Sequence, residues 1–268
     1  MDSVGVLSEQ AGSDRLAGLD WELIGAAPRA AGLQLALDEV LLDRVASGQR
    51  PPTLRFWAWS EAALVLGSHQ VLANEVDLEE ASRMGIRVLR RMSGGGTMLN
   101  LPGASITYSL YVPAAPFADL SLAASYALFD SWVVAALRAL GVPASYRPLN
   151  DLIDGRGKMG GAAQARRRGA ILHHTTIAWS IEPELIPRLI RIGRPPVVER
   201  GVRSAEKVVS PMTQHTSLSR EQVEEHMARW FTALTGARPG SILEDEEAAA
   251  RELAEQKYET EGWLRRLE

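Results

Sequence analysis

Three consecutive glycines preceded by two arginines form the first group of residues whose types could do chemistry. Glycine adopts positive φ freely and leaves backbone N–H groups unshielded, so these groups can line up on phosphate oxygens. Arginine can pair with a phosphate or a carboxylate. The segment therefore predicts an anion-binding loop, with a flexible hairpin turn as the alternative, and no Gly-Lys-Ser/Thr follows to make it a Walker loop. It reads Arg90-Arg91-Met92-Ser93-Gly94-Gly95-Gly96-Thr97.

A lysine among small residues is the second group. Lys158 lies within the glycine-rich stretch 155–162, and Asn150 and Asp151 precede that stretch. An ammonium group is a compact charge that can stabilise negative charge on a phosphate or an acyl oxygen. The carboxylate of Asp151 could hold a magnesium ion or a hydroxyl group. The alternative is an exposed hairpin loop that carries an ordinary solvated lysine.

Two further polar groups are the arginines at 166–168 and the pair His173 and His174. The arginines fit a solvated turn before a strand, or a surface that docks an acidic protein, since three charges are too few for nucleic-acid affinity. Alternation along a strand would point one of these histidines inward and the other outward. The remaining histidines show no zinc-site spacing, and no Gly-x-Ser-x-Gly motif supports a Ser-His-Asp mechanism.

The composition excludes several classes of function. The 268 residues contain no cysteine, so disulfide scaffolds, cysteine-ligated zinc and cysteine nucleophiles are ruled out. A net charge of −4 argues against broad nucleic-acid binding. No apolar run approaches the roughly 18 residues of a membrane span, and no secretory signal is visible. We therefore expect a cytoplasmic protein without a membrane partner.

Hydrophobic periodicity and capping signals predict the elements that must position these groups. Helices are expected over 33–45, 77–85, 122–140 and 219–236. The last of them opens with Ser219 and Gln222, which make a capping box. Strands are expected over 53–59, 63–66, 86–89, 105–112 and 170–179, and the strand over 105–112 alternates as if half-buried.

The order of these elements predicts an α/β (α+β) domain with a mixed sheet flanked by helices, because the alternating rhythm of a doubly wound fold is absent. Residues 1–18 are rich in glycine, serine and aspartate, and we expect a flexible N-terminal arm. The catalytic domain is expected over 19–238. Residues 239–268 are poor in apolar side chains, so we expect a helical tail on the domain surface or against a partner.

Taken in order along the chain, these motifs resemble the lipoate–protein ligase family, within the wider biotin/lipoate ligase and octanoyltransferase fold. The resemblance covers about residues 30–235, and its most specific motif is Arg-Arg-x-Ser-Gly-Gly-Gly at 90–96. The other segments are Leu-Ala-Leu-Asp-Glu at 35–39, Leu-Arg-Phe-Trp-Ala-Trp at 54–59, Leu-Gly-Ser-His-Gln at 66–70, Asn-Asp-Leu at 150–152, Gly-Lys-Met-Gly-Gly-Ala-Ala-Gln at 157–164, Leu-His-His-Thr-Thr at 172–176 and Gly-Val-Arg-Ser at 201–204.

The resemblance implies a catalytic domain of the class II aminoacyl-tRNA synthetase and biotin synthetase type. It implies two steps: lipoate and Mg²⁺-ATP give lipoyl-AMP, and a lysine of an acceptor domain then takes the lipoyl group. The acceptors would be lipoyl domains of 2-oxoacid dehydrogenase complexes or the glycine cleavage H protein. A separate accessory ligase subunit is a further expected partner. Neither a nucleic acid nor a membrane is expected to take part.

The resemblance also implies site roles, position by position. Lys158 would be the catalytic residue and would touch both the lipoyl carbonyl and the phosphate. Asp151 would lie near the nucleotide and its metal, and His174 would help to line the pocket. The apolar tunnel for the lipoyl tail is expected around Trp57, Leu66, Ile106 and Tyr108. The adenylate would be held by Arg91, Ser93, Gly94, Gly95, Gly96, Thr97, Met98, Leu99, Asn150, Asp151, Lys158, Gly161, Ala162 and His174.

The sequence departs from the family pattern at three places. Met98-Leu99-Asn100 stands where Tyr-His-Asp is common, and His174-Thr175-Thr176 stands where His-Gly-Thr is common. The sequence also ends near 268, where larger ligases continue into an accessory domain. An ATP-dependent ligase is the leading expectation, because related octanoyltransferases use a cysteine nucleophile. The alternative is a non-adenylating lipoyl or octanoyl transferase, or a lipoyl-AMP-binding protein, of the same fold.

Overall fold

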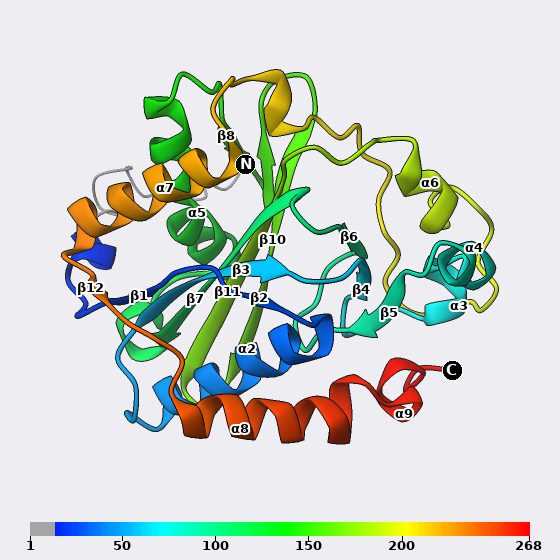
Figure 1. Ribbon diagram of the computed structural model, residues 1–268, viewed down its shortest axis with the longest axis horizontal. Coiled ribbons are helices and arrows are strands. Elements are labelled where there is room, and N and C mark those ends of the chain that lie inside the picture. The colour runs from blue at the N-terminus through cyan, green and yellow to red at the C-terminus, as the bar shows by residue number, and fades with distance from the viewer. Residues whose placement is uncertain (1–13) are drawn as a thin grey trace.

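A nine-stranded mixed sheet forms the centre of the computed structural model, which describes residues 14–268 (Figure 1). Its strands are β1 (Glu22–Ile24), β2 (Pro28–Arg29), β3 (Thr53–Trp59), β7 (Ser105–Pro113), β8 (Ser145–Arg147), β9 (Asp151–Ile153), β10 (Lys158–Arg167), β11 (Ala170–Ala178) and β12 (Arg238–Pro239). Their order is β12-β1-β3-β7-β11-β10-β9-β8, with β2 beside β3. Pairing is parallel among β12, β1, β3 and β2, and antiparallel from β3 through to β8.

A second, three-stranded sheet holds residues 93–97, here called the glycine segment. It consists of β4 (Ala63–Leu66), β5 (Arg87–Arg90) and β6 (Met98–Asn100), in the order β5-β4-β6. Because β5 and β6 flank β4 on opposite sides, residues 91–97 cross the end of β4 and do not close a hairpin between adjacent strands. The short helices α3 (Leu72–Glu75), α4 (Leu78–Arg83) and α6 (Leu185–Leu189) lie around this sheet (Figure 1).

Helices cover both faces of the main sheet. These are α2 (Ala31–Ala46) on one face and α5 (Leu122–Ala139) with α7 (Arg220–Thr235) on the other (Figure 1). On β7, Tyr108 packs on Trp132 of α5, with ring centroids 4.9 Å apart, while Ser109 hydrogen-bonds Asp38 of α2. The central strand β7 is therefore buried on both faces, and the predicted half-buried strand is wrong.

The predicted helices are confirmed with small shifts of their ends. Asp77 caps α4 by accepting the N–H of Glu80, and the predicted capping box of α7 is formed. Gly236 ends α7 with φ of +71°. Helix α5 is long and apolar enough to cross a membrane, yet its large residues Phe129 and Trp132 pack in the sheet core, so α5 is the core helix of this fold.

The two ends of the described chain are packed against the domain. Residues 14–17 are helical and Leu16 is fully buried, so the predicted flexible arm is wrong for 14–18, while residues 1–13 lie outside the described part. At the other end, α8 (Glu244–Leu253), η3 (Ala254–Tyr258) and α9 (Glu261–Leu264) lie against α2 and β5 (Figure 1). The predicted tail therefore lies on the surface of its own domain.

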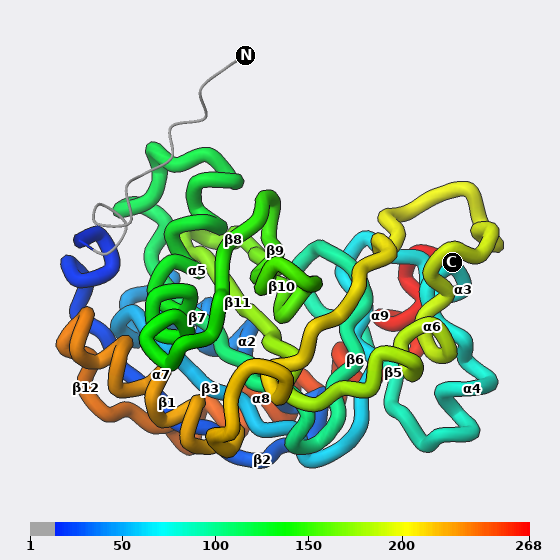
Figure 2. Tube along the Cα trace, turned by 90° about the horizontal axis from the view of Figure 1, so that it is seen from above, coloured from blue at the N-terminus to red at the C-terminus, as the bar shows by residue number. Residues whose placement is uncertain are grey.

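Residues 197–210 form an extended segment, here called the strap. It runs from the side of α6 towards the start of β10 (Figure 2). The strap contains no helix or strand, apart from an isolated bridge between Val209 and Lys158. Two short 3₁₀ turns complete the described elements, η1 (Ala115–Phe117) and η2 (Met212–Gln214). The strap thus places polar side chains from the last third of the chain beside the start of β10.

Candidate functional site

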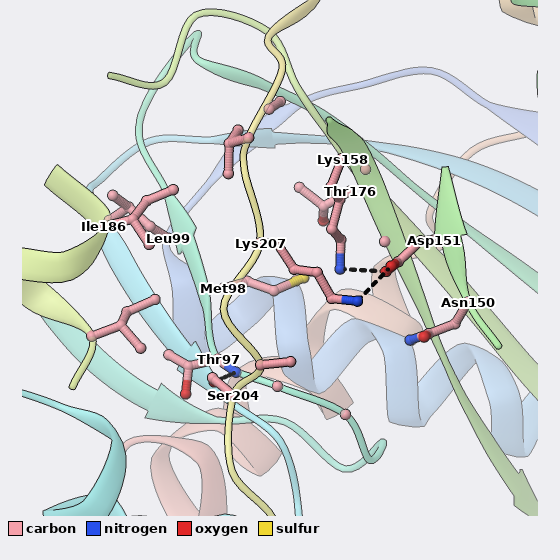
Figure 3. A pocket seen from close by; sticks show the side chains of 18 of the residues that line it. Thr97, Met98, Leu99, Asn150, Asp151, Lys158, Thr176, Ile186, Ser204 and Lys207 are labelled. Carbon is pink, nitrogen blue, oxygen red and sulfur yellow. Dashed lines mark hydrogen bonds and ion pairs between the residues drawn. The ribbon is translucent and has the colours of Figure 1, made fainter. Parts of the chain in front are cut away.

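A cavity of about 340 Å³ lies between the main sheet and the small sheet. Its walls come from the glycine segment, β6, β9, β10, the region of α6 and the strap. The strap passes across it, with charged side chains on one side and Ile186 and Leu99 on the other (Figure 3). Volumes of this order are typical of small-molecule sites. The cavity is therefore the candidate functional site.

Asp151 is the centre of the charged end. Its Oδ1 lies 2.8 Å from Nζ of Lys158, and its Oδ2 lies 3.1 Å from Nζ of Lys207 (Figure 3). Arg147 also reaches Oδ2, at 3.1 Å. Strands β9 and β10 set this arrangement because Asp151 pairs with Gly161, and Lys158 lies over that glycine, where a Cβ would meet Nζ at 2.6 Å.

The three cations decide the charge state of Asp151. Burial raises the pKa of a carboxyl group, but hydrogen bonds and attraction from Lys158, with hydrogen bonds from Arg147 and Lys207, outweigh it and hold the pKa of Asp151 below its ordinary value. One carboxylate thus faces three positive groups. The side chains of Lys158 and Lys207 are 29% and 37% exposed, so the surplus charge can act on a ligand. This end suits an anion or a carbonyl oxygen that gains negative charge.

Lysine is rare in this chain, which makes its use in the cavity informative. Of 29 basic residues only three are lysines, and the other 26 are arginines. Two of the three, Lys158 and Lys207, converge on one carboxylate. The third, Lys257, is bound to Glu39 and packs over the ring of Trp263. Two of the three compact ammonium charges of the chain are therefore found where a ligand can reach them.

Asp151 does not fit the predicted role of a magnesium ligand. Magnesium prefers several oxygen ligands in nearly octahedral geometry. Both oxygens of Asp151 already bind cations, and Asp151 is the only carboxylate among the described residues that line the cavity. Within residues 14–268, no cluster of three histidine, aspartate or glutamate side chains could hold a metal ion. Asp151 is therefore a partner of the two lysines and is poorly suited to bind a metal ion.

Arg91 lines the cavity, and its guanidinium also holds the glycine segment from within. Its predicted contact with a ligand phosphate stays a prediction. Arg91 is 2% exposed, and its Nε donates to Oγ of Ser93. Its other nitrogens donate to the carbonyls of Val65, Gly94 and Gly96. Desolvation lowers the pKa of Arg91 to about 10, which leaves the guanidinium charged at neutral pH. Its neighbour Arg90 is likewise buried and donates to the carbonyls of Gly67, Gln70 and Leu264.

The carbonyl groups that accept hydrogen bonds from Arg91 fix the direction of the next N–H groups in the glycine segment. In a trans peptide the N–H points opposite to the C=O. Because the carbonyl of Gly94 points at Arg91, the N–H of Gly95 points away from it, and none of the N–H groups of Gly94, Gly95 and Gly96 donates to another described group. Gly95 has φ of +89°, a conformation that favours glycine. Gly95, Gly96, Thr97, Met98 and Leu99 line the cavity as predicted, whereas Ser93 and Gly94 do not.

His174 lies behind the glycine segment and does not line the cavity, which corrects its predicted role. Its Nδ1 lies 2.8 Å from Oδ2 of Asp38, and its Nε2 lies 2.6 Å from Oγ of Ser93. Burial lowers the pKa of His174, although the hydrogen bond to Asp38 opposes this. The imidazole is therefore neutral at neutral pH and links α2 to the glycine segment. Its neighbour His173 lies on the other face of the sheet, against Asp130 of α5. Both histidines are buried, so the prediction that one of them points outward is wrong, because helices cover both faces of the sheet.

The remaining predicted site residues divide between the cavity and the scaffold. Asn150, Gly161 and Ala162 line the cavity, and the side chain of Asn150 donates to the carbonyl of Ala162 at 2.6 Å. The residues predicted to form the tunnel are buried in the core and do not line the cavity: they are Trp57, Leu66, Ile106 and Tyr108. The apolar wall instead consists of Met98, Leu99, Ile181, Ile186, Ile190, Ile192 and Val209.

The arginines at 166–168 lie at the far end of β10 from Lys158. Arg166 donates to Ser125, Arg167 pairs with Glu39 and Arg168 pairs with Asp43. Arg168 has φ of +50° in the turn between β10 and β11. Arg166 and Arg167 end β10, and only Arg168 lies in the turn before β11, so the predicted turn is confirmed for Arg168 alone. None of the three lines the cavity.

Sequence reasoning missed the contribution of the strap. Arg203, Ser204 and Lys207 line the cavity. Oγ of Ser204 accepts the N–H of Thr97 at 2.9 Å, which ties the strap to the glycine segment. The motif Gly-Val-Arg-Ser at 201–204 marked this region, but it has no periodicity or composition that assigns it a role.

Comparisons with known sequences agree with this geometry. The family described as lipoyl protein ligase A/B catalytic domain matches residues 31–232. Octanoyltransferase LipM of Kyrpidia tusciae is 30% identical over 91% of this chain and 97% of that protein. Lipoate-protein ligase A subunit 1 of Thermoplasma acidophilum is 28% identical over 86% of this chain and 90% of that protein. Both kinds of acyl-transferring enzyme thus resemble the chain at similar identity.

Solved structures show the same fold. A lipoate-protein ligase A bound with ATP superposes with a TM-score of 0.78 at 27% identity, covering 93% of this chain and 100% of that one. A lipoate protein ligase of T. acidophilum, determined with bound lipoic acid, gives 0.76 at 27% identity, covering 91% and 99%. A bi-partite ligase studied with its E2 lipoyl domain, also from T. acidophilum, gives 0.78 at 26% identity, covering 93% and 98%.

Proposed function

This chain belongs to the lipoyl protein ligase A/B catalytic domain family, and we propose that it transfers an octanoyl or lipoyl group from an activated donor to a lysine of a lipoyl domain. The observation that carries the proposal is that the cavity has a charged end and an apolar end. Lys158, Lys207 and Asp151 lie at one end, and an isoleucine-rich wall lies at the other. An activated acyl chain matches both ends, since its carbonyl group gains negative charge in the reaction and its hydrocarbon tail is apolar.

Direct transfer is the mechanism that the residues support. The acceptor amine attacks the acyl carbonyl carbon, the bond to the leaving group breaks, and the amine proton leaves with that group or to water. Lys158 would stabilise the carbonyl oxygen as it becomes negative, and Lys207 would stabilise the departing group. No acyl-enzyme on cysteine can form, because the chain has none. Catalysis would then rest on positioning and charge stabilisation.

A pre-activated donor is favoured over lipoate and ATP by two observations. Octanoyltransferases are among the similar relatives, one of them 30% identical. The predicted phosphate ligand Arg91 is used within the glycine segment, and Asp151 is poorly suited to magnesium. Two of the residues predicted to hold Mg²⁺-ATP, Arg91 and Asp151, therefore already bind groups of the protein itself.

An ATP-dependent ligase is the second candidate, and one feature of the site favours it. The N–H groups of Gly95 and Gly96 have no acceptor among the described residues and could bind an adenylate phosphate. The chain also resembles a ligase structure with bound ATP. The Thermoplasma relative is named as one subunit of a ligase, so a separate accessory subunit belongs to this candidate.

A donor panel separates the two candidates. The purified chain is incubated with a lipoyl domain and one of three donors: an octanoyl thioester of a carrier protein, octanoyl-AMP, or octanoate with Mg²⁺-ATP. The proposal predicts that an activated donor, the thioester or octanoyl-AMP, adds one octanoyl group to the acceptor lysine, as seen by intact-mass spectrometry, and that octanoate with Mg²⁺-ATP adds none. Modification with octanoate and Mg²⁺-ATP would make the chain a ligase. The absence of modification with all three donors would refute both candidates.

A further inference from the structure

A second buried carboxylate, Asp154, lies just outside the cavity, in the turn that precedes Lys158. Oδ1 of Asp154 accepts the backbone N–H groups of Arg156 and Gly157, each at 2.8 Å. Oδ2 of Asp154 accepts the hydroxyl of Ser210 and lies 2.5 Å from Nε2 of His215. Ser210 ends the strap, and His215 follows η2. One buried carboxylate therefore joins the Lys158 turn to the end of the strap.

The backbone repeats this connection. The N–H of Lys158 donates to the carbonyl of Val208 at 2.7 Å, and the N–H of Ser210 donates to the carbonyl of Lys158 at 2.9 Å. Gly157 permits the approach, because a Cβ there would lie 2.5 Å from the carbonyl oxygen of Val208. Lys207 directly precedes these bonded residues. A shift of the strap would therefore move Lys207 relative to Lys158.

We propose that Asp154, Ser210 and His215 form a latch that fixes the spacing of Lys158 and Lys207 across Asp151. The three latch residues do not line the cavity, so they are positioning residues that act through the two lysines. The proposal rests on the proposed function only for its effect on turnover. Its structural half, a fixed lysine pair, can be measured without any substrate.

The other end of the strap is anchored separately, which confines the effect of the latch. Glu75 accepts the N–H and the hydroxyl of Ser204, and Asn74 binds the backbone at Val197 and Val198. Between the two anchored ends lies the exposed stretch 205–208. Opening the latch therefore frees Lys207 and leaves the contact of Ser204 with the glycine segment in place.

The charge of the latch is stable over the neutral range. Burial opposes ionisation of Asp154, but hydrogen bonds from Ser210, from two backbone amides and from His215 outweigh it and lower its pKa to about 2. The carboxylate thus remains an acceptor at all ordinary assay conditions.

Lysine acetylation measures the latch directly, since the chain has only three lysines. The variants are His215→Ala, the milder Ser210→Ala, and His215→Gln, whose amide can still donate to Asp154. The matched control is His226→Ala on α7, which removes the contact of His226 with the carbonyl of Ala136. We expect His215→Ala to raise the acetylation rates of Lys207 and Lys158 about threefold, as local opening exposes them. Lys257, remote from the latch, is the internal reference.

The outcomes are distinct. Restored protection in His215→Gln, with no change in His226→Ala, supports the latch. Unchanged labelling of Lys158 and Lys207 in both His215→Ala and Ser210→Ala, with native labelling of Lys257, overturns it. Equal gains at all three lysines would mean general unfolding and would also overturn it.

Turnover gives the second readout. With a donor that the wild-type chain uses, His215→Ala should lower kcat about tenfold while KM for the acyl donor changes less than twofold, because the lysines are displaced and the apolar wall is intact. An unchanged kcat in a variant with loosened lysines contradicts the role in catalysis. A wild-type chain that uses no donor refutes the proposed function, and the labelling result then still decides whether the latch exists.

Discussion

Two carboxylates with cationic partners lie on opposite sides of the glycine segment, and they do different work. Asp38 binds Arg55, Tyr111, Ser109 and His174, and its side chain is 2% exposed. Asp151 binds Lys158 and Lys207, whose side chains remain partly exposed in the cavity. The first, here called the closed cluster, is buried and supports the glycine segment through His174. The second, here called the open cluster, can contact a ligand in the cavity. Exposure of the partners, more than charge, distinguishes a scaffold from a site.

The largest effect is expected at the open cluster, for Lys158→Ala. Loss of the ammonium should lower kcat/KM for acyl transfer about 10²- to 10³-fold, because it stabilises negative charge at the acyl carbonyl. The melting temperature should stay near that of the wild type. Arg147→Gln is the control, since Arg147 shares Asp151 but does not line the cavity. Nearly normal transfer by Lys158→Ala would remove this lysine from the mechanism.

A substitution in the closed cluster should lower the stability of the fold. Asp38→Ala leaves the buried guanidinium of Arg55 without its carboxylate, so we expect a loss of about 3–5 kcal/mol in the free energy of unfolding, measured with urea. Asp119→Ala, which removes an exposed partner of Arg15, is the control and should leave the urea midpoint unchanged. A small loss for Asp38→Ala would show that the cluster does not hold the fold.

Lys207 tests whether the open cluster needs two lysines. Lys207→Met should lower kcat/KM about thirtyfold, which is about 2 kcal/mol for a lost charge-assisted contact. Lys207→Arg keeps the charge and should recover most of the rate. If Lys207→Met and the wild type transfer at the same rate, the strap lysine only balances the charge of Asp151.

The apolar wall should give a smaller, selective effect. Ile186→Ala enlarges the end of the cavity opposite to Lys158 (Figure 3), so kcat/KM should fall about fivefold for octanoyl donors and less for longer chains. Leu122→Ala, at an exposed leucine on α5, is the matched control. An equal effect on all chain lengths would place the tail elsewhere.

The closed cluster should also give a modest dependence of stability on pH. Burial lowers the pKa of His174 below 6.5, so the unfolded chain binds a proton more readily, and stability should fall as the pH drops below about 6.5. The pKa of Asp38 is also lowered, because hydrogen bonds from His174 and Tyr111 and attraction from Arg55 outweigh burial, so a second loss should follow below about pH 4. Thermal melts should show the first loss in the wild type and lack it in His174→Gln.

Local patterns in the sequence were enough to predict the helices and most strands. Periodicity located α2 and α5, and the Ser219–Gln222 capping box located α7. The predicted half-buried β7 was wrong because alternation of polar and apolar residues also occurs where both faces are covered: Ser109 and Tyr111 bind Asp38. Burial of this kind depends on distant helices, which local patterns do not specify.

The site was predicted in part. Lys158, Asp151 and the glycine segment line one cavity, as the motifs indicated. The prediction that His174 lines the cavity was wrong, since residue type does not tell whether a side chain faces a ligand or other groups of the protein. The predicted phosphate contact of Arg91, which lines the cavity, stays a prediction. Lys207 and the isoleucines near α6 were missed because the strap and the region of α6 reach the cavity only through long-range packing.

The central claim is that Lys158 promotes direct acyl transfer without an acyl-enzyme. The most direct test is a single-turnover reaction of the chain with an octanoyl thioester and a lipoyl domain, without ATP, followed by intact-mass spectrometry of both proteins. We predict one octanoyl group on the acceptor, none on the chain, and loss of the reaction in Lys158→Ala. A stable octanoyl adduct on the chain, or an acceptor modified equally by Lys158→Ala, would contradict the claim.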